Sequence, residues 1–342
     1  MTNLKYEITD IRHPKHPNLR QIRALRDIPA YGVKAGDLGG FVGSESNLSQ
    51  EGGGCWVSGQ AVVYGGAKVS GDAHVYGNAY VSGDAHVSGD ALVSGYAQVH
   101  GDAKVNGDAQ VYGDATVYGA AHVLGKAEIT GNAQVFGNVQ VSGRVKVSGN
   151  ATVSERARVT DTARIIGRAR VFGDSLVYGN AVISGNAHVS GHAEVTGTAK
   201  VSGDTRVYGL SRVRGNAMIT DRARVHESAW VYEDAQVSGN AVISGNAHVF
   251  GTAKVSGNAH VSKGLVKEYK GTNTHPDQRE SFTAPSNGTV EICPQGRTIP
   301  ESVTVISNGA VEIRVKGHTI PESVASLIGR NGDWTVRFEG VT

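Results

Sequence analysis

Residues 69–93 read VSGDAHVYGNAYVSGDAHVSGDALV, and the same hexapeptide unit extends in both directions from this stretch. Stepping by six from Val57 to Val261 gives 35 positions without a break in phase, and each of them is Val or Ile. A small residue, usually Ala, stands two positions before each of them, and Gly followed by Asp or Asn stands after most of them. Such self-similarity at a fixed short period is typical of a repeat architecture.

The chemistry of the unit predicts a short strand followed by a corner. Ala and Val two positions apart lie on the same side of a strand, and Val favours strands because its branched side chain packs well on a pleated surface. Gly, Asp and Asn tolerate positive φ angles, which tight corners require. A helix is excluded because a period of six does not keep one face of an α-helical turn. Stacking each unit on an equivalent unit would pair the backbone and bury Ala and Val together.

The units VSGDAH, VYGNAY and VSGNAH resemble the hexapeptide repeat of left-handed parallel β-helices, and the resemblance covers residues 55–262. In that family three hexapeptides form one triangular coil. The resemblance therefore implies an all-β, left-handed parallel β-helix of about 12 triangular coils. Residues 19–57, which contain LRQIRALRDI and GVKAGDLGGFV, are similar to the opening of the YdcK-type subgroup, whose members are commonly labelled acetyltransferases because of their repeats.

Four segments follow from these patterns. Residues 1–54 precede the repeat, and alternating apolar positions in 6–11 and 19–24 predict a β-hairpin that caps the open end of the helix. Residues 55–262 form the repeat, and residues 263–286 lack periodicity and read as a linker. In residues 287–342 the motif NGTVEI, which starts at Asn287, returns as NGAVEI from Asn308. This internal repeat predicts a small all-β domain serving as a cap, an assembly element or a binding module.

Composition excludes several classes of protein. Gly makes up 47 of 342 residues but Pro only 8, so collagen is excluded, and two cysteines, Cys55 and Cys293, cannot build a disulfide scaffold. No apolar run is long enough for a membrane span. The opening MTNLKYEITD has no apolar segment of a signal peptide, so we expect a cytoplasmic protein, or a virion-associated one if a phage encodes it.

Aromatic residues recur at every third unit on the outward side of the repeat. Such rows either stack along one chain or contact another chain. We take Tyr118, Phe136, Phe172 and Tyr208 as candidate interface residues. The family resemblance implies a homo-oligomer, with a trimer favoured. One full row contains Tyr64, Ser82, His100, Tyr118, Phe136, Ser154, Phe172, Ser190, Tyr208 and His226, and a second contains Tyr178, Thr196, Arg214, Tyr232 and Phe250.

Charge varies along the repeat. Residues 55–140 carry seven acidic and three basic residues, whereas residues 141–172 carry seven basic and two acidic ones. Because the arginines are spread over all three predicted faces, we expect a solvated surface and no nucleic-acid partner. Stacked corner residues such as Asp72, Asp90 and Asp108 could hold Ca²⁺, but turn formation alone explains them, so we predict no metal site.

If the chain is an enzyme, we expect a histidine to be its general base. The hexapeptide-repeat acyltransferases use a His as general base in a cleft between trimer subunits, so the resemblance implies acetyl-CoA as cofactor and His74, His86 and His122 as catalytic candidates. Those enzymes resemble helices interrupted by loops that build the pockets, whereas this repeat has no insertion. We therefore expect a non-enzymatic structural or interaction protein without a cofactor. The alternatives are an acetyl-CoA-dependent acyltransferase and a phage- or surface-associated spike or adhesin.

Overall fold

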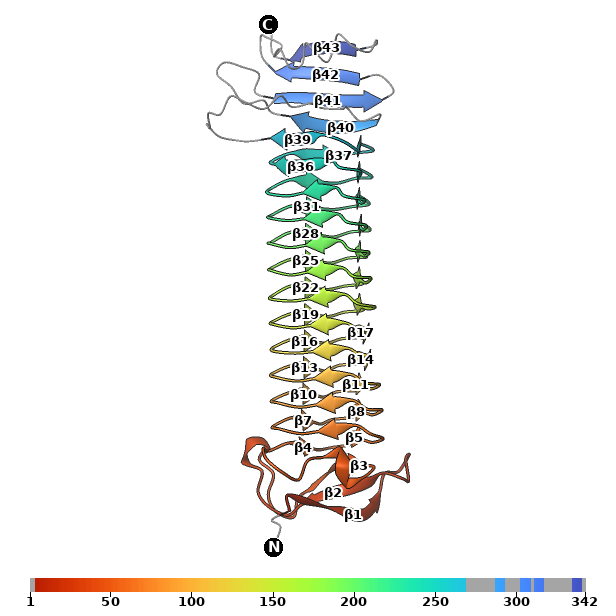
Figure 1. The fold of residues 1–342 in the computed structure, drawn as a ribbon, viewed down its shortest axis with the longest axis vertical. Helices are drawn as coiled ribbons and strands as arrows, with labels where there is room; N and C mark the ends of the chain where they lie inside the picture. Colours follow the sequence, from red (N-terminus) through yellow and green to blue (C-terminus); the bar gives the residue numbers. More distant parts are fainter. Residues whose placement is uncertain (1–3, 269–286, 293–301, 309–310, 317–333, 340–342) are drawn as a thin grey trace. The chain divides into compact units, whose positions relative to one another are not determined.

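The computed structural model describes residues 4–268, 287–292, 302–308, 311–316 and 334–339. The chain forms two compact units, Met1–Gly179 and Asn180–Thr342. In both units short strands alternate with tight corners, as the hexapeptide pattern predicts (Figure 1).

The first unit begins with a cap of antiparallel strands. The predicted hairpin is present as β1 (Tyr6–Arg12) and β2 (Arg20–Ala24), and β3 (Leu38–Val42) pairs with the other edge of β2. Strand β3 then runs parallel to the first solenoid strand on its side, with Phe41 opposite Val62. Two short 3₁₀ helices, η1 (Pro29–Tyr31) and η2 (Glu45–Asn47), complete the cap. The cap thus continues directly into the solenoid through β3.

Twenty-one short strands follow in the first unit, three to a coil, which makes seven coils among the described residues. They form three parallel sheets, named here faces A, B and C. Face A contains β5 (Val62–Val63), β8 (Tyr80–Val81), β11 (Gln98–Val99), β14 (Thr116–Gly119), β17 (Gln134–Gly137), β20 (Thr152–Val153) and β23 (Arg170–Val171). Face B contains β4 (Trp56–Val57), β7 (His74–Val75), β10 (Leu92–Val93), β13 (Gln110–Val111), β16 (Glu128–Ile129), β19 (Lys146–Val147) and β22 (Arg164–Ile165). Face C contains β6 (Lys68–Val69), β9 (His86–Val87), β12 (Lys104–Val105), β15 (His122–Val123), β18 (Gln140–Val141), β21 (Arg158–Val159) and β24 (Leu176–Val177).

The second unit repeats this arrangement with fifteen strands, which make five coils and three faces, named D, E and F. Face D contains β26 (His188–Val189), β29 (Arg206–Val207), β32 (Arg224–Val225), β35 (Val242–Ile243) and β38 (His260–Val261). Face E contains β25 (Val182–Ile183), β28 (Lys200–Val201), β31 (Met218–Ile219), β34 (Gln236–Val237) and β37 (Lys254–Ser256). Face F contains β27 (Glu194–Val195), β30 (Arg212–Val213), β33 (Trp230–Val231), β36 (His248–Gly251) and β39 (Leu265–Glu268).

Longer strands follow the coils of the second unit. They are β40 (Asn287–Ile292), β41 (Ser302–Asn308), β42 (Val311–Lys316) and β43 (Trp334–Glu339). Strand β40 pairs antiparallel with β37 and with β41, β41 pairs antiparallel with β42, and β42 pairs parallel with β43. Strand β39 lies within the segment predicted as a linker, so the coil extends beyond residue 262, and residues 269–286 lie outside the described part.

Register and burial confirm the predicted all-β parallel helix. Within each unit the solenoid strands pair in parallel with the equivalent strands of the next coil, so that Leu92 lies opposite Gln110 and Val93 opposite Val111. Backbone N–H groups donate to carbonyl groups on the next coil, as from Trp56 to Ala73 over 3.0 Å. The inward Ala and Val side chains have almost no exposed surface along the coils, and Ser175, Thr205 and Ser211 fill three of the small positions. The interior is therefore occupied by protein atoms and not by a channel.

The corners explain the glycine content. Gly71 has a φ of 67°, and a Cβ atom placed on it would lie 2.9 Å from the backbone nitrogen of Gly89 on the next coil. Five corners carry an acid in the same left-handed region: Glu155, Asp161, Asp221, Glu227 and Glu233. In four of them the carboxylate accepts a hydrogen bond from the backbone N–H of the equivalent corner on the next coil, as Asp221 does from Gly239 at 2.8 Å. This bond offsets the cost of positive φ at a residue with a Cβ.

We expect Asp221→Ala to lower the free energy of unfolding by about 1–2 kcal/mol, because alanine keeps the unfavourable φ and loses the hydrogen bond to Gly239. Asp221→Gly loses the same hydrogen bond, but glycine adopts the positive φ without strain. Its free energy of unfolding should therefore fall by less than that of Asp221→Ala. Urea unfolding of the full chain, followed by circular dichroism, measures both. If the free energy of unfolding falls equally in the two variants, the left-handed backbone at this corner has no energetic cost.

Candidate functional site

The structure does not bring the three candidate catalytic histidines together. His74 lies on face B in β7, whereas His86 and His122 lie on face C in β9 and β15. Lys104 stands between the latter two, paired in register with each of them. His86 is exposed and His122 is half-buried. Face C thus presents two separate imidazoles, one on either side of a lysine.

His74 is held as a packing element between the cap and the first coils. Its ring stacks on Tyr31 of the cap, with centroids 4.1 Å apart, and on Tyr76, 4.6 Å away. Its Nε2 atom lies 2.8 Å from the Ser58 hydroxyl oxygen. Burial lowers the pKa of His74 from its ordinary 6.5 to about 4, so the ring is neutral at pH 7. A His74 ring that stacks on two tyrosines is better suited to holding the cap against the first coils than to acting as an accessible base.

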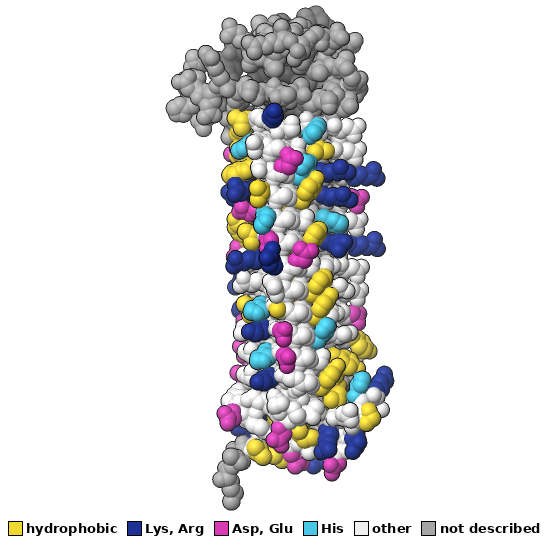
Figure 2. Space-filling view, turned by 45° about the vertical axis from the view of Figure 1, so that its right-hand side comes forward, with side chains coloured by type: hydrophobic (Ala, Val, Ile, Leu, Met, Phe, Trp, Pro, Cys, Tyr) yellow, Lys and Arg dark blue, Asp and Glu magenta, His cyan; other side chains and the backbone are white. Residues whose placement is uncertain are grey.

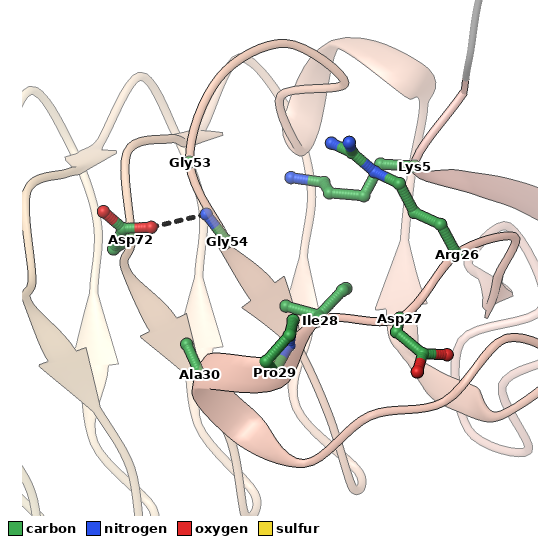
Figure 3. Close-up of a pocket in the computed structure, with 9 residues that line it drawn as sticks. All are labelled: Lys5, Arg26, Asp27, Ile28, Pro29, Ala30, Gly53, Gly54 and Asp72. Atoms are coloured by element: carbon green, nitrogen blue, oxygen red, sulfur yellow. Dashed lines mark hydrogen bonds between the residues drawn. The ribbon is translucent and has the colours of Figure 1, made fainter.

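A hollow of about 320 Å³ opens where the cap meets the first coil. Figure 3 shows Lys5 and Arg26 extending from the cap toward the loop of Gly53 and Gly54, and the Gly54 N–H group donates to Asp72. Asp27, which also lines the hollow, is ion-paired with Lys34 at 2.9 Å. Polar groups therefore converge at this junction, in contrast to the Ala and Val interior of the coils.

Sequence reasoning missed Lys5, Arg26 and this hollow. The cap has no periodicity that would indicate which of its side chains point inward. One signal was present: Cys55 occupies the small inward position of the first unit, where Ala usually stands. Ser175, Thr205 and Ser211 replace Ala at the same position in later coils, so this signal alone does not identify the hollow.

The candidate interface residues occupy short stacked rows. On face A the rings of Tyr118 and Phe136 lie 4.7 Å apart and nearly parallel, and His100 stacks on Tyr118 at 5.0 Å. Phe172, on the same face, lies beneath the Arg170 guanidinium, which is 5.8 Å from the ring centroid. In the second unit Tyr208 stacks on His226 at 4.8 Å. Figure 2 shows hydrophobic side chains in short rows separated by polar surface.

One member of the second predicted aromatic row is not an exposed residue. Phe250 is only 8% exposed, and its ring stacks on Tyr232 at 4.9 Å. Strand β36, which carries Phe250, is longer than most solenoid strands and pairs with β39 over four residues. The expectation that this whole row faces solvent is therefore wrong at Phe250.

Charged side chains are partly neutralised between neighbouring coils. Lys146 on face B bonds to Glu128 at 2.9 Å, and Arg156 at a corner bonds to Asp174 at 2.8 Å. In the second unit Glu194 accepts from Arg214 at 2.7 Å. The basic segment 141–172 is thus balanced in part by acids one coil away, which weakens its field toward an anionic polymer.

The described part of the chain offers neither a metal cluster nor a membrane-spanning helix. No group of three or more His, Cys, Asp or Glu side chains there is arranged to hold a metal ion. No helix in the same part of the chain is long and apolar enough to cross a membrane.

We expect acid to weaken the His74 stack. Because the pKa of folded His74 is about 4 and the ordinary value is 6.5, the unfolded chain binds the additional proton, and stability falls as pH drops from about 6.5 toward 4. His74→Phe keeps a ring between the tyrosines and removes the titration, so its thermal midpoint should fall less over that window. His86→Phe, at the exposed site, is the matched control. An NMR titration that gives His74 a pKa near its ordinary value would contradict this account.

Comparison with known proteins agrees with this geometry. The family model of the YdcK β-solenoid repeat matches residues 85–101, 109–125 and 235–251. Each matched stretch begins at an inward Ala and spans almost one coil. No curated protein matches the chain. The stacked coils show a β-solenoid repeat protein, and three of its stretches are similar to the YdcK β-solenoid repeat.

Proposed function

We propose that the chain is a non-enzymatic structural or interaction protein, in which flat solenoid faces contact other chains. The observation that carries this proposal is the unbroken hexapeptide spacing of the coils. From Val57 to Val261 no residue is inserted between units, so no loop stands out to build a pocket. Enzyme sites are concave, and walls of very short strands and tight corners offer little concave surface.

The dispersed histidines support the same proposal. An acyltransferase needs a base next to a groove that holds the acyl donor and the acceptor. His74 is enclosed by two tyrosines, and His86 and His122 stand on a different face. The acyltransferase alternative would therefore depend on an assembly that supplies the rest of the pocket.

Face A is the surface that we assign to self-association, and a second and third copy of this chain are its proposed occupants. Tyr118 and Phe136 present a stacked, half-buried pair beside His100. Aromatic side chains are enriched in protein interfaces because they bury a large area at low entropic cost. The resemblance to the hexapeptide-repeat family favours a trimer.

The double variant Tyr118→Ser with Phe136→Ser should convert the assembly to monomers, because it removes the aromatic area from face A. Light scattering coupled to size exclusion measures the mass of each form. Lys104→Ser with His122→Ser, on face C, is the matched control and should keep the mass of the unaltered protein. An unchanged mass in the face A variant would exclude this surface as the contact.

Calorimetry with acetyl-CoA separates the proposal from the acyltransferase alternative. A protein without an acyl-donor pocket should give only the heat of dilution. Micromolar binding of acetyl-CoA would overturn the non-enzymatic proposal, and its loss in His74→Ala, His86→Ala or His122→Ala would show which histidine lies at the binding site.

A further inference from the structure

Lys5 and Cys55 form a buried pair at the junction between the cap and the solenoid. Lys5 is 1% exposed and Cys55 is fully buried, and the Lys5 Nζ atom lies 2.9 Å from the Cys55 Sγ atom. Lys5 directly precedes β1, whereas Cys55 directly precedes β4, the first solenoid strand. The two side chains thus join segments that are 50 residues apart in the sequence.

The thiol is the partner that the structure gives to the Lys5 amine. A buried cation requires a group of opposite charge or a strong hydrogen bond. Figure 3 shows the nearby Asp27 carboxylate turned away from Lys5, and that carboxylate is paired with Lys34. Lys5 and Cys55 are neutral together either as ammonium and thiolate or as amine and thiol, and one proton moving between Nζ and Sγ interconverts the two forms.

The pair lies beside the hollow at the junction between the cap and the first coil. Lys5 lines the hollow of about 320 Å³, together with Gly54, the neighbour of Cys55 in the chain. The Sγ atom has two further contacts, with the carbonyl oxygens of Ser49 and Val69, both at 3.7 Å. Neither contact places a second thiol or a carboxylate at the sulfur, so the amine is the group placed to capture an oxidised sulfur.

We propose that Lys5 and Cys55 are a modification site, at which hydrogen peroxide joins the cap covalently to the first coil. Peroxide first oxidises Sγ: an S–O bond forms, the O–O bond breaks, and the released hydroxide takes up a proton as water, which leaves a sulfenic acid. The Nζ lone pair then attacks Sγ. An N–S bond forms, the S–O bond breaks, and the hydroxide leaves as water with a proton from Nζ.

The product is a sulfenamide, the type of bond that sulfenic acids also form with backbone nitrogen. The sulfur is oxidised by two electrons, one peroxide is reduced to two waters, and the chain loses two hydrogen atoms. Because the link closes the whole cap into a loop, it restrains cap opening in the way that a disulfide does. A thiol reductant reverses it by attack on the sulfur.

The test uses the full chain carrying Cys293→Ser, so that Cys55 is its sole thiol. After peroxide treatment, tryptic mass mapping should find the Lys5 and Cys55 peptides joined, with two hydrogens lost and no cleavage after Lys5. Dithiothreitol should restore both peptides. Thermolysin should cut the cap of the oxidised form at least about tenfold more slowly than that of the reduced form.

Two variants make the assignment specific. Lys5→Met should leave a sulfenic acid that dimedone traps, with no joined peptide, whereas Lys34→Met, at an exposed lysine of the cap, should still form the link. A joined peptide that retains one added oxygen would support the same pair, bridged through that oxygen. A Cys55 thiol that survives peroxide, or that becomes sulfinic acid while trypsin still cleaves after Lys5, would overturn the proposal.

Discussion

The backbone register between coils is the constraint on which each unit depends. Within a unit the solenoid strands pair in parallel with their equivalents on the next coil, because each short strand is too small to be stable by itself. This register places Ala on Ala and Val on Val inside the coil, where neither has appreciable exposed surface. Inserting a single residue into a unit would turn the next Val outward, because side-chain direction alternates along a strand. The fixed spacing of six follows from that requirement.

The corners show how the same constraint selects residues. A left-handed φ is needed once in each hexapeptide, and Gly meets the need without strain. Where Glu155 or Asp161 stands instead, the backbone keeps the left-handed conformation, with φ of 63° at both residues. At Asp161 the hydrogen bond from the Gly179 backbone to the carboxylate offsets part of the cost of that conformation.

The sequence predicted the structure well where its pattern is periodic and poorly where it is not. The Val57–Val261 ladder predicted the strands, the corners and the buried side chains, and the alternation in residues 6–11 predicted the hairpin. The hollow at Lys5 could not be predicted, because side-chain direction in the irregular cap is set by tertiary packing. The burial of Phe250 was also missed, because it lies where the longer strand β36 departs from the standard unit. The three histidine candidates were chosen by residue type, and the coil geometry then placed them on two different faces.

The interchangeability of the coils has a consequence for how such a chain can change in length. Because the inward residues of one coil are nearly the same as those of the next, duplication or loss of one whole coil leaves every remaining pair in register. Unequal recombination within the gene can therefore lengthen or shorten a unit in whole steps while both its ends stay the same. The length of the solenoid can therefore evolve separately from the chemistry of its cap.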